Sequence, residues 1–106
     1  MIAKLFNKVK DLTKKPHKHH IVAQFAPMAA PARAVLRSVD IGVNSEANYV
    51  MLSPKFHWYL HTNIYYGLVN WQVIDAYAFA GENKQEAVGD RLEEIRNFLI
   101  KLDQSW

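Results

Sequence analysis

The stretch that decides the fold is Asn48-Tyr-Val-Met-Leu-Ser-Pro-Lys-Phe-His57-Trp-Tyr-Leu-His61. Ser53 followed by Pro54 is typical of a helix start, because serine can cap the first turn with its side-chain oxygen and proline loses no hydrogen bond there. A helix from about residue 54 places His57 and His61 one turn apart on one face. Two imidazoles so placed can bind one metal ion from one rigid element. No glutamate lies between them, which argues against a His-Glu-x-x-His metalloprotease.

Another group of histidines lies upstream, in the segment His17-Lys18-His19-His20-Ile21-Val22. The β-branched pair Ile21-Val22 favours an extended conformation, so we expect a short strand with the histidines at its start. The apolar residues from 49 to 52 predict a second short strand, which runs directly into the His57 helix. The sequence therefore predicts two short strands in front of a metal-competent helix.

Helical periodicity dominates the rest of the chain. A lysine-rich amphipathic helix is expected over residues 2–13, and Pro16 ends it. This helix could bind a membrane surface or phosphates. The interpretation we favour is a solvated helix that is docked on the core. A core helix is expected over residues 63–79, with Gly81 as its stop signal. An amphipathic helix with a structural role is expected over residues 84–103.

The aromatic residues of the central helix allow two interpretations. Tyr65, Tyr66 and Trp71 could stack on nucleic-acid bases. Aromatic side chains at helical spacing more often pack in a core, which is the interpretation we favour.

Length and composition narrow the classes of function. A chain of 106 residues is expected to form one domain, and the absence of cysteine excludes disulfides and thiolate metal sites. Any metal must therefore be held by histidine or oxygen. The net charge of +3 is compatible with a polyanionic partner. No apolar run approaches the ~20 residues of a membrane span, so we expect neither membrane insertion nor a signal peptide.

Several motifs together point to a known family. They are His19-His20-Ile-Val-Ala, Ala32-Arg33-x-x-Leu36, Ile41-Gly42-x-Asn44-Ser-x-x-Asn48, Leu52, His57-x-x-x-His61-Thr62 and Tyr65-Tyr66. In this combination the chain resembles the HNH endonucleases of the ββα-metal (His-Me finger) type, and among them the AHH toxin nucleases at the C-termini of polymorphic bacterial toxins. It departs from that pattern at Lys18, where the name-giving alanine would stand, and in the long interval from His20 to Asn48.

The resemblance implies an α+β fold. This is a mostly helical small domain around a ββα-metal core with two short antiparallel strands, and the helices at 2–13 and 84–103 flank it within a single nuclease domain, residues 1–106. The same resemblance implies that the chain is the toxin domain of a larger protein.

The resemblance also implies roles for individual residues. His19, His57 and His61 would bind one divalent ion, His20 would be the general base and Asn48 would orient that base. These roles suit phosphodiester hydrolysis, which needs an activated water and a Lewis acid at the phosphate. Neighbouring residues on a regular strand face opposite ways, so the roles of the two adjacent histidines could be reversed if the strand is regular.

The donor set indicates the metal. Three histidine nitrogens and an open position suit Zn²⁺ or another transition metal better than Mg²⁺, which remains an alternative for activity. Arg33 is our candidate for a phosphate clamp, because a guanidinium can bind phosphate through two nitrogens. The alternative is that Arg33 and Arg37 are two solvated residues on one helix face.

These observations predict a metal-dependent endonuclease that hydrolyses nucleic acid, with DNA favoured over RNA. We expect it to be delivered as part of a larger toxin, to act in the cytoplasm of a target cell and to have a cognate immunity protein that is acidic and covers a basic surface. The alternative from another class is a nucleic-acid or membrane-surface binding module in which the metal is structural.

Overall fold

The fold is mostly helical with one small sheet, as predicted. A computed structural model describes residues 15–106, and the basic helix predicted over residues 2–13 lies outside them. The elements in chain order are β1 (His17–His20), the 3-10 turn η1 (Pro27–Ala29), α2 (Ala30–Ser38), the 3-10 turn η2 (Glu46–Asn48), β2 (Tyr49–Leu52), α3 (Pro54–Tyr59), α4 (Asn63–Ala78) and α5 (Lys84–Ser105). The α+β class is confirmed.

The sheet consists of β1 and β2, which pair antiparallel with His19 opposite Val50 and His20 opposite Tyr49. The second strand has the predicted bounds. The first strand is also confirmed, but its extent was predicted wrongly, because it consists of the histidine segment itself and ends where Ile21 was expected to continue it. Directly after His20 the chain bends into the core.

The bend has a clear cause in the hydrogen bonds of Asn48. The amide N–H of Ile21 donates to the Asn48 main-chain oxygen at 2.8 Å, and the amide N–H of Val22 donates to the Asn48 side-chain oxygen at 2.9 Å. Ile21 and Val22 are 0% and 1% exposed. Their β-branched side chains are therefore buried in the core. The N–H of Val22, which would pair with another strand if β1 were longer, is bound by the side chain of Asn48 instead.

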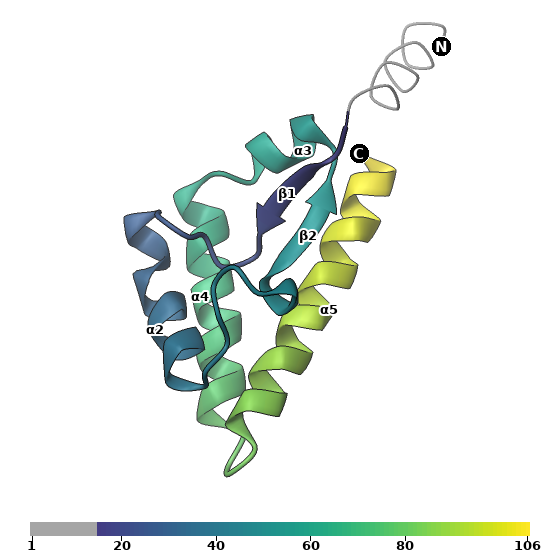
Figure 1. Cartoon of the computed structure of the whole chain (residues 1–106). Helices are drawn as coiled ribbons and strands as arrows, with labels where there is room; N and C mark the ends of the chain where they lie inside the picture. Colours follow the sequence, from purple (N-terminus) through teal and green to yellow (C-terminus); the bar gives the residue numbers. More distant parts are fainter. Residues whose placement is uncertain (1–14) are drawn as a thin grey trace, which may run out of the picture.

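Helices α4 and α5 form the body of the molecule and carry the sheet at one end (Figure 1). Helix α5 runs beside β2, whereas α2 packs on α4. Both long helices match the predicted ranges within two residues, and Gly81 in the turn between them has a φ of +63°, a conformation that glycine adopts without strain. One apolar core is shared by the sheet and the helices. Its fully buried members include Ile21, Leu36, Leu52, Val73, Val88 and Leu92.

Helix α5 also holds the segments that carry the site. Arg96 donates to three main-chain oxygens of η2 and β2, those of Glu46, Ala47 and Tyr49, at 2.9–3.1 Å. Asp103 accepts the main-chain N–H of Ser53 at 3.0 Å and its hydroxyl at 2.6 Å. The predicted capping of α3 by the Ser53 side chain is therefore wrong, because a carboxylate on α5 binds that hydroxyl instead.

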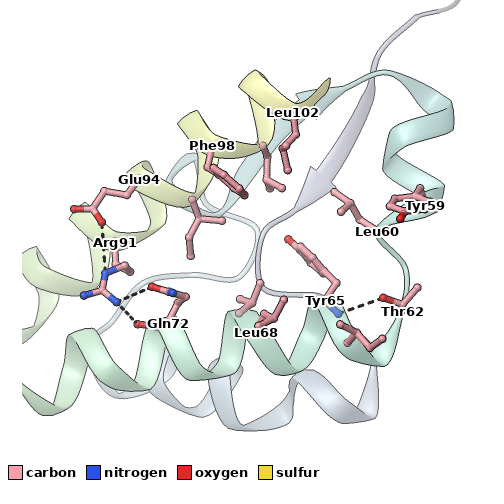
Figure 2. A pocket seen from close by; sticks show the side chains of 14 residues that line it. Tyr59, Leu60, Thr62, Tyr65, Leu68, Gln72, Arg91, Glu94, Phe98 and Leu102 are labelled. Atoms are coloured by element: carbon pink, nitrogen blue, oxygen red, sulfur yellow. Dashed lines mark hydrogen bonds and ion pairs between the residues drawn. The ribbon is translucent and has the colours of Figure 1, made fainter. Parts of the chain in front are cut away.

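An apolar groove of about 710 Å³ lies between α4 and α5. Figure 2 shows Leu68 on α4 and Phe98 and Leu102 on α5 along it, with Arg91 and Gln72 bonded to each other near one end. Tyr65 also lines this groove, and its hydroxyl connects the groove to the histidines described below. None of the helices among residues 15–106 combines the length and apolar character needed to cross a membrane.

Candidate metal centre

Three histidines from β1, α3 and the turn after α3 lie close together. One ring nitrogen each of His19, His57 and His61 can be chosen so that all lie within 4.8 Å of one another. Nδ1 of His19 lies 3.0 Å from Nδ1 of His57, and Nε2 of His57 lies 3.3 Å from Nε2 of His61. We call these three residues the histidine cluster. It contains the three metal ligands proposed from the sequence, and no other group of this kind occurs within residues 15–106.

His61 reaches the cluster from outside α3. The sequence predicted one helix through both histidines, but α3 ends at Tyr59. The chain then makes a tighter turn, in which the His61 N–H donates to the Trp58 oxygen at 3.1 Å. Thr62 caps the next helix by accepting the Tyr65 N–H at 3.2 Å, so the chain must change direction here. The change of direction keeps the His57 and His61 rings 4.6 Å apart.

The donor set and spacing of the cluster fit a transition metal. An ion bound tetrahedrally at 2.0–2.1 Å holds its nitrogen ligands about 3.3 Å apart. The two short nitrogen distances, 3.0 and 3.3 Å, lie close to that value. Each of these contacts uses a different nitrogen of His57, so only one of them can be the distance between two ligand atoms. Three imidazoles from one strand, one helix and one turn could thus hold an ion and leave one position open.

Tyr65 fixes which nitrogen of His19 can bind metal. Its hydroxyl donates to the Ile21 main-chain oxygen at 2.8 Å, so its own oxygen must accept a proton from Nε2 of His19, 2.9 Å away. Burial raises the pKa of Tyr65 far above its usual range, which keeps the hydroxyl protonated. The lone pair of His19 therefore lies on Nδ1, the nitrogen that faces His57.

Tyr66 makes a similar contact to the third histidine. Its hydroxyl lies 3.2 Å from Nδ1 of His61, which leaves Nε2 of that ring facing His57. Reasoning from the sequence treated Tyr65 and Tyr66 as packing or base-stacking residues and missed these contacts. The available signal was their position, three and four residues after the Thr62 that follows the second histidine of the motif.

The imidazole rings of the histidine cluster stay neutral at pH 7. Burial, together with the neighbouring imidazoles, lowers the pKa of His19 to about 3 and that of His57 to about 4. Burial also lowers the pKa of His61. A proton on any of these rings would place a charge in a poorly hydrated space beside two other imidazoles. Neutral imidazole is the form that binds metal, so the site needs no deprotonation at pH 7.

His20 lies beside the cluster but does not belong to it. Strand β1 is regular through His20, so its ring leaves the strand on the other side from His19. Nε2 of His20 lies 2.7 Å from the side-chain oxygen of Asn44. An oxygen acceptor there requires the proton on Nε2 and leaves Nδ1 free to accept one. A charge on His20 would slightly lower the pKa of both His19 and His57.

Asn48 anchors the chain that follows His20. Its side chain is fully buried, and besides accepting the Val22 N–H it donates to the oxygens of Val22 and Val43 at 3.0 and 2.8 Å. One amide thus joins the segment after β1 to the loop that carries Asn44. The residue that touches the His20 ring is Asn44. Asn48 instead binds the backbone of Val22, which follows His20, and of Val43, which precedes Asn44.

A comparison of the sequence with models of known protein families identifies the family of this chain. The model of the AHH family, a nuclease family of the HNH/ENDO VII superfamily with conserved AHH, matches residues 7–99. The chain belongs to this nuclease family. No curated protein and no solved structure matched the chain.

The AHH nuclease carries a lysine where its family name has alanine. Lys18 is exposed, and its ammonium group lies 4.5 Å from the centre of the Tyr49 ring. Because side chains alternate along β1, Lys18 points away from the face that carries His19. The departure from the family motif therefore falls on the outer face of the strand.

Arg33 of the AHH nuclease is not part of the cluster. Its Nη1 donates to the main-chain oxygens of Ala23 and Ala26 at 2.9 and 2.6 Å, so this atom holds the loop after β1. The side chain is half-buried. Its role as a phosphate clamp stays a prediction, for which only the remaining guanidinium nitrogens are candidates.

Proposed function

We propose that this AHH nuclease is a metal-dependent endonuclease that hydrolyses phosphodiester bonds, with DNA favoured as its substrate. The observation that carries the proposal is the histidine cluster, in which one ring nitrogen of each residue lies within 4.8 Å of the others, together with His20, which directly follows His19 and keeps Nδ1 free while Nε2 binds Asn44. Metal ligands and a base side by side are what hydrolysis of a phosphodiester requires.

His19, His57 and His61 would hold one divalent ion, Zn²⁺ or another transition metal, with Mg²⁺ as an alternative for activity. Once bound, this ion would supply positive charge to the scissile phosphate and the leaving oxygen. The tyrosines at 65 and 66 would keep two of the rings in the orientation that binding needs.

His20 would act as the general base through Nδ1. It takes a proton from the attacking water as the new phosphorus–oxygen bond forms and the bond to the leaving oxygen breaks. Asn44 keeps the other ring nitrogen protonated and the ring in place, and Asn48 keeps the backbone of this region in place.

The biological setting is also part of the proposal. The net charge of +3 supports a polyanionic substrate and an acidic partner. We propose a single nuclease domain over residues 1–106 that is delivered as part of a larger toxin, acts in the cytoplasm of the target cell and is neutralised by a cognate immunity protein. Production of the domain alone in a bacterial cytoplasm should then be toxic, and harmless production would contradict the toxin role.

Cleavage assays with the purified protein test the activity. Plasmid DNA, single-stranded DNA and tRNA are incubated with the wild-type domain and with His20→Ala, each with added divalent ions and with chelator. We expect chelator to abolish cleavage, and His20→Ala to bind metal normally but cleave poorly. Full activity of His20→Ala would contradict the role of the base. Chelator-induced unfolding without cleavage by any ion would instead support the binding-module alternative.

A further inference from the structure

Trp58 lies beside the histidine cluster rather than in the core. It is on α3 between the two histidines, and its ring centre is 5.0 Å from those of His57 and His61 and 6.3 Å from that of His17. These three histidines are the aromatic neighbours of Trp58 among the described residues. Its side chain is 62% exposed. A large flat apolar surface therefore stands open beside the candidate metal ligands.

The other aromatic residues of α3 have structural partners. Phe56 is 3% exposed and belongs to the core. Tyr59 packs against Trp106, with ring centres 5.4 Å apart. Trp58 follows Phe56 by two positions, so it points to nearly the opposite side of the helix. The packing of α3 is thus complete without this indole, and packing does not explain why a tryptophan occupies the position.

We propose that Trp58 forms a subsite that stacks on a nucleobase next to the scissile phosphate. The inference rests on the proposed nuclease function and deepens it. A base is joined to its phosphate through a single sugar, so a phosphate at the cluster brings a base within reach of a ring that touches His57 and His61. Exposed aromatic side chains bind bases of any sequence in this way, because every base has a flat face.

This subsite defines a class of substrate. In a duplex, both faces of a base are covered by its neighbours, whereas an unpaired nucleotide can turn one face to a protein ring. The AHH nuclease therefore prefers single-stranded or locally unpaired DNA to a continuous duplex of the same sequence.

Paired variants separate stacking from a general effect of losing a tryptophan. Trp58→Ala is compared with Trp58→Phe, which keeps a ring, and with Trp106→Ala, where the original side chain is 57% exposed and packs against Tyr59. We expect Trp58→Ala to lower kcat/KM on a single-stranded oligonucleotide about 5- to 100-fold, mostly through KM. Trp58→Phe should stay within a few-fold of wild type, and Trp106→Ala should be unchanged. Bound metal should be equal in all four proteins.

An abasic oligonucleotide, which lacks the bases next to the cleavage position, provides the matching change in the substrate. The wild type should cleave it as slowly as Trp58→Ala cleaves the intact strand, and Trp58→Ala should not distinguish the two strands. If wild type and Trp58→Ala cleave intact DNA equally well, the stacking subsite is excluded. A loss of bound metal that accounts for the loss of activity in Trp58→Ala would exclude it as well.

A binding measurement keeps the test independent of cleavage. The chain has three tryptophans, so Trp71→Phe and Trp106→Phe leave Trp58 as the single reporter, and His20→Ala prevents hydrolysis. Quenching of its fluorescence by the intact oligonucleotide, but not by the abasic one, supports stacking even if the wild type cleaves nothing. An unchanged spectrum at saturating DNA, with binding followed by anisotropy of a labelled strand, overturns it. A failure of nuclease function and a failure of the subsite are therefore distinguishable.

Discussion

The hydroxyl oxygen of Tyr65 accepts a hydrogen bond from Nε2 of His19 over 2.9 Å, and this contact decides which nitrogen of the histidine carries the lone pair. The direction follows from the second contact of the hydroxyl, which donates its only proton to Ile21. A residue on α4 thereby sets the chemistry of a residue on β1. Such partners of metal-binding histidines commonly change metal affinity when they are removed.

Tyr65→Phe should therefore weaken metal binding. The ring still fills its place in the core, but His19 loses the partner that holds its proton on Nε2. We expect a 10- to 100-fold rise in the Kd for Zn²⁺, measured by competition with a chromophoric chelator. Tyr77→Phe serves as the control, because Tyr77 lies on the same helix with its ring against Lys84. Equal affinities of the two variants would show that the hydroxyl does not act on the metal site.

Metal should stabilise the fold through the three clustered histidines. At free Zn²⁺ 100 times above its Kd, binding adds about 2.7 kcal/mol to the free energy of unfolding, which should raise the Tm by at least about 10 °C. His61→Ala should lose this rise. His17→Ala should retain it, although the His17 ring lies 5.2 Å from that of His57. Thermal melts with and without chelator measure both; a lost rise in His17→Ala would place a fourth ligand in the site.

Acid should destabilise the metal-free fold. The pKa of His19 falls from 6.5 to about 3 and that of His57 to about 4 on folding, so the unfolded chain binds protons first as the pH falls. Their contribution to stability is complete above pH 6.5 and is lost as the pH falls toward 4. The loss is at most about 1.4 kcal/mol per pH unit for each histidine.

Urea unfolding in chelator, repeated between pH 7 and pH 5, measures that slope. His19→Gln removes one of the titrating groups, so its free energy of unfolding should fall less steeply than that of the wild type by up to about 1.4 kcal/mol per pH unit. Parallel slopes would mean that His19 is not held neutral by the fold.

Asn44 should affect the rate and not the metal. Asn44→Ala removes the acceptor 2.7 Å from Nε2 of His20, so the ring can rotate and change its tautomer. We expect kcat to fall about 10- to 100-fold, with little change in KM or in bound metal. Asn44→Asp keeps an oxygen acceptor and should keep most of the activity. The control is Asn97→Ala, because Asn97 is an exposed asparagine of α5. A similar loss of kcat in that variant would show that the effect does not come from the contact between Asn44 and His20.

Asn48 should affect stability instead. Asn48→Ala leaves the N–H and oxygen of Val22 and the oxygen of Val43 without their partner in the interior. This should cost about 3 kcal/mol or more in urea unfolding. Asn70→Ala loses two bonds to main-chain groups at a more exposed place and should cost less. If Asn48→Ala is as stable as Asn70→Ala, the buried amide does not anchor the chain as described.

The sequence predicted those parts of the fold that depend on local pattern. Strand β2 and the helices α4 and α5 have the periodicity and stop signals of their elements, and their predicted positions are confirmed. The three proposed metal ligands are also brought together, since a turn of about four residues keeps His57 and His61 adjacent whether or not the helix continues.

The errors arose where a distant side chain competed for a local group. Ile21 and Val22 have strand propensity, but the side-chain amide of Asn48 binds the N–H and the oxygen of Val22, and the strand ends before them. Ser53 is suited to cap α3, but Asp103 of α5 binds its hydroxyl. Propensity describes a residue in the context of its neighbours, so contacts between residues far apart in the chain cannot be derived from it.

The contact between Asp103 and Ser53 has a consequence for synthesis on the ribosome. The start of α3 is bound by a residue made 50 positions later. A nascent chain in which His19, His57 and His61 have already emerged still lacks both of these hydrogen bonds. The helix that carries His57 acquires its anchor only when α5 has been made as far as Asp103, so the arrangement of the site is completed well after its three histidines have been synthesised.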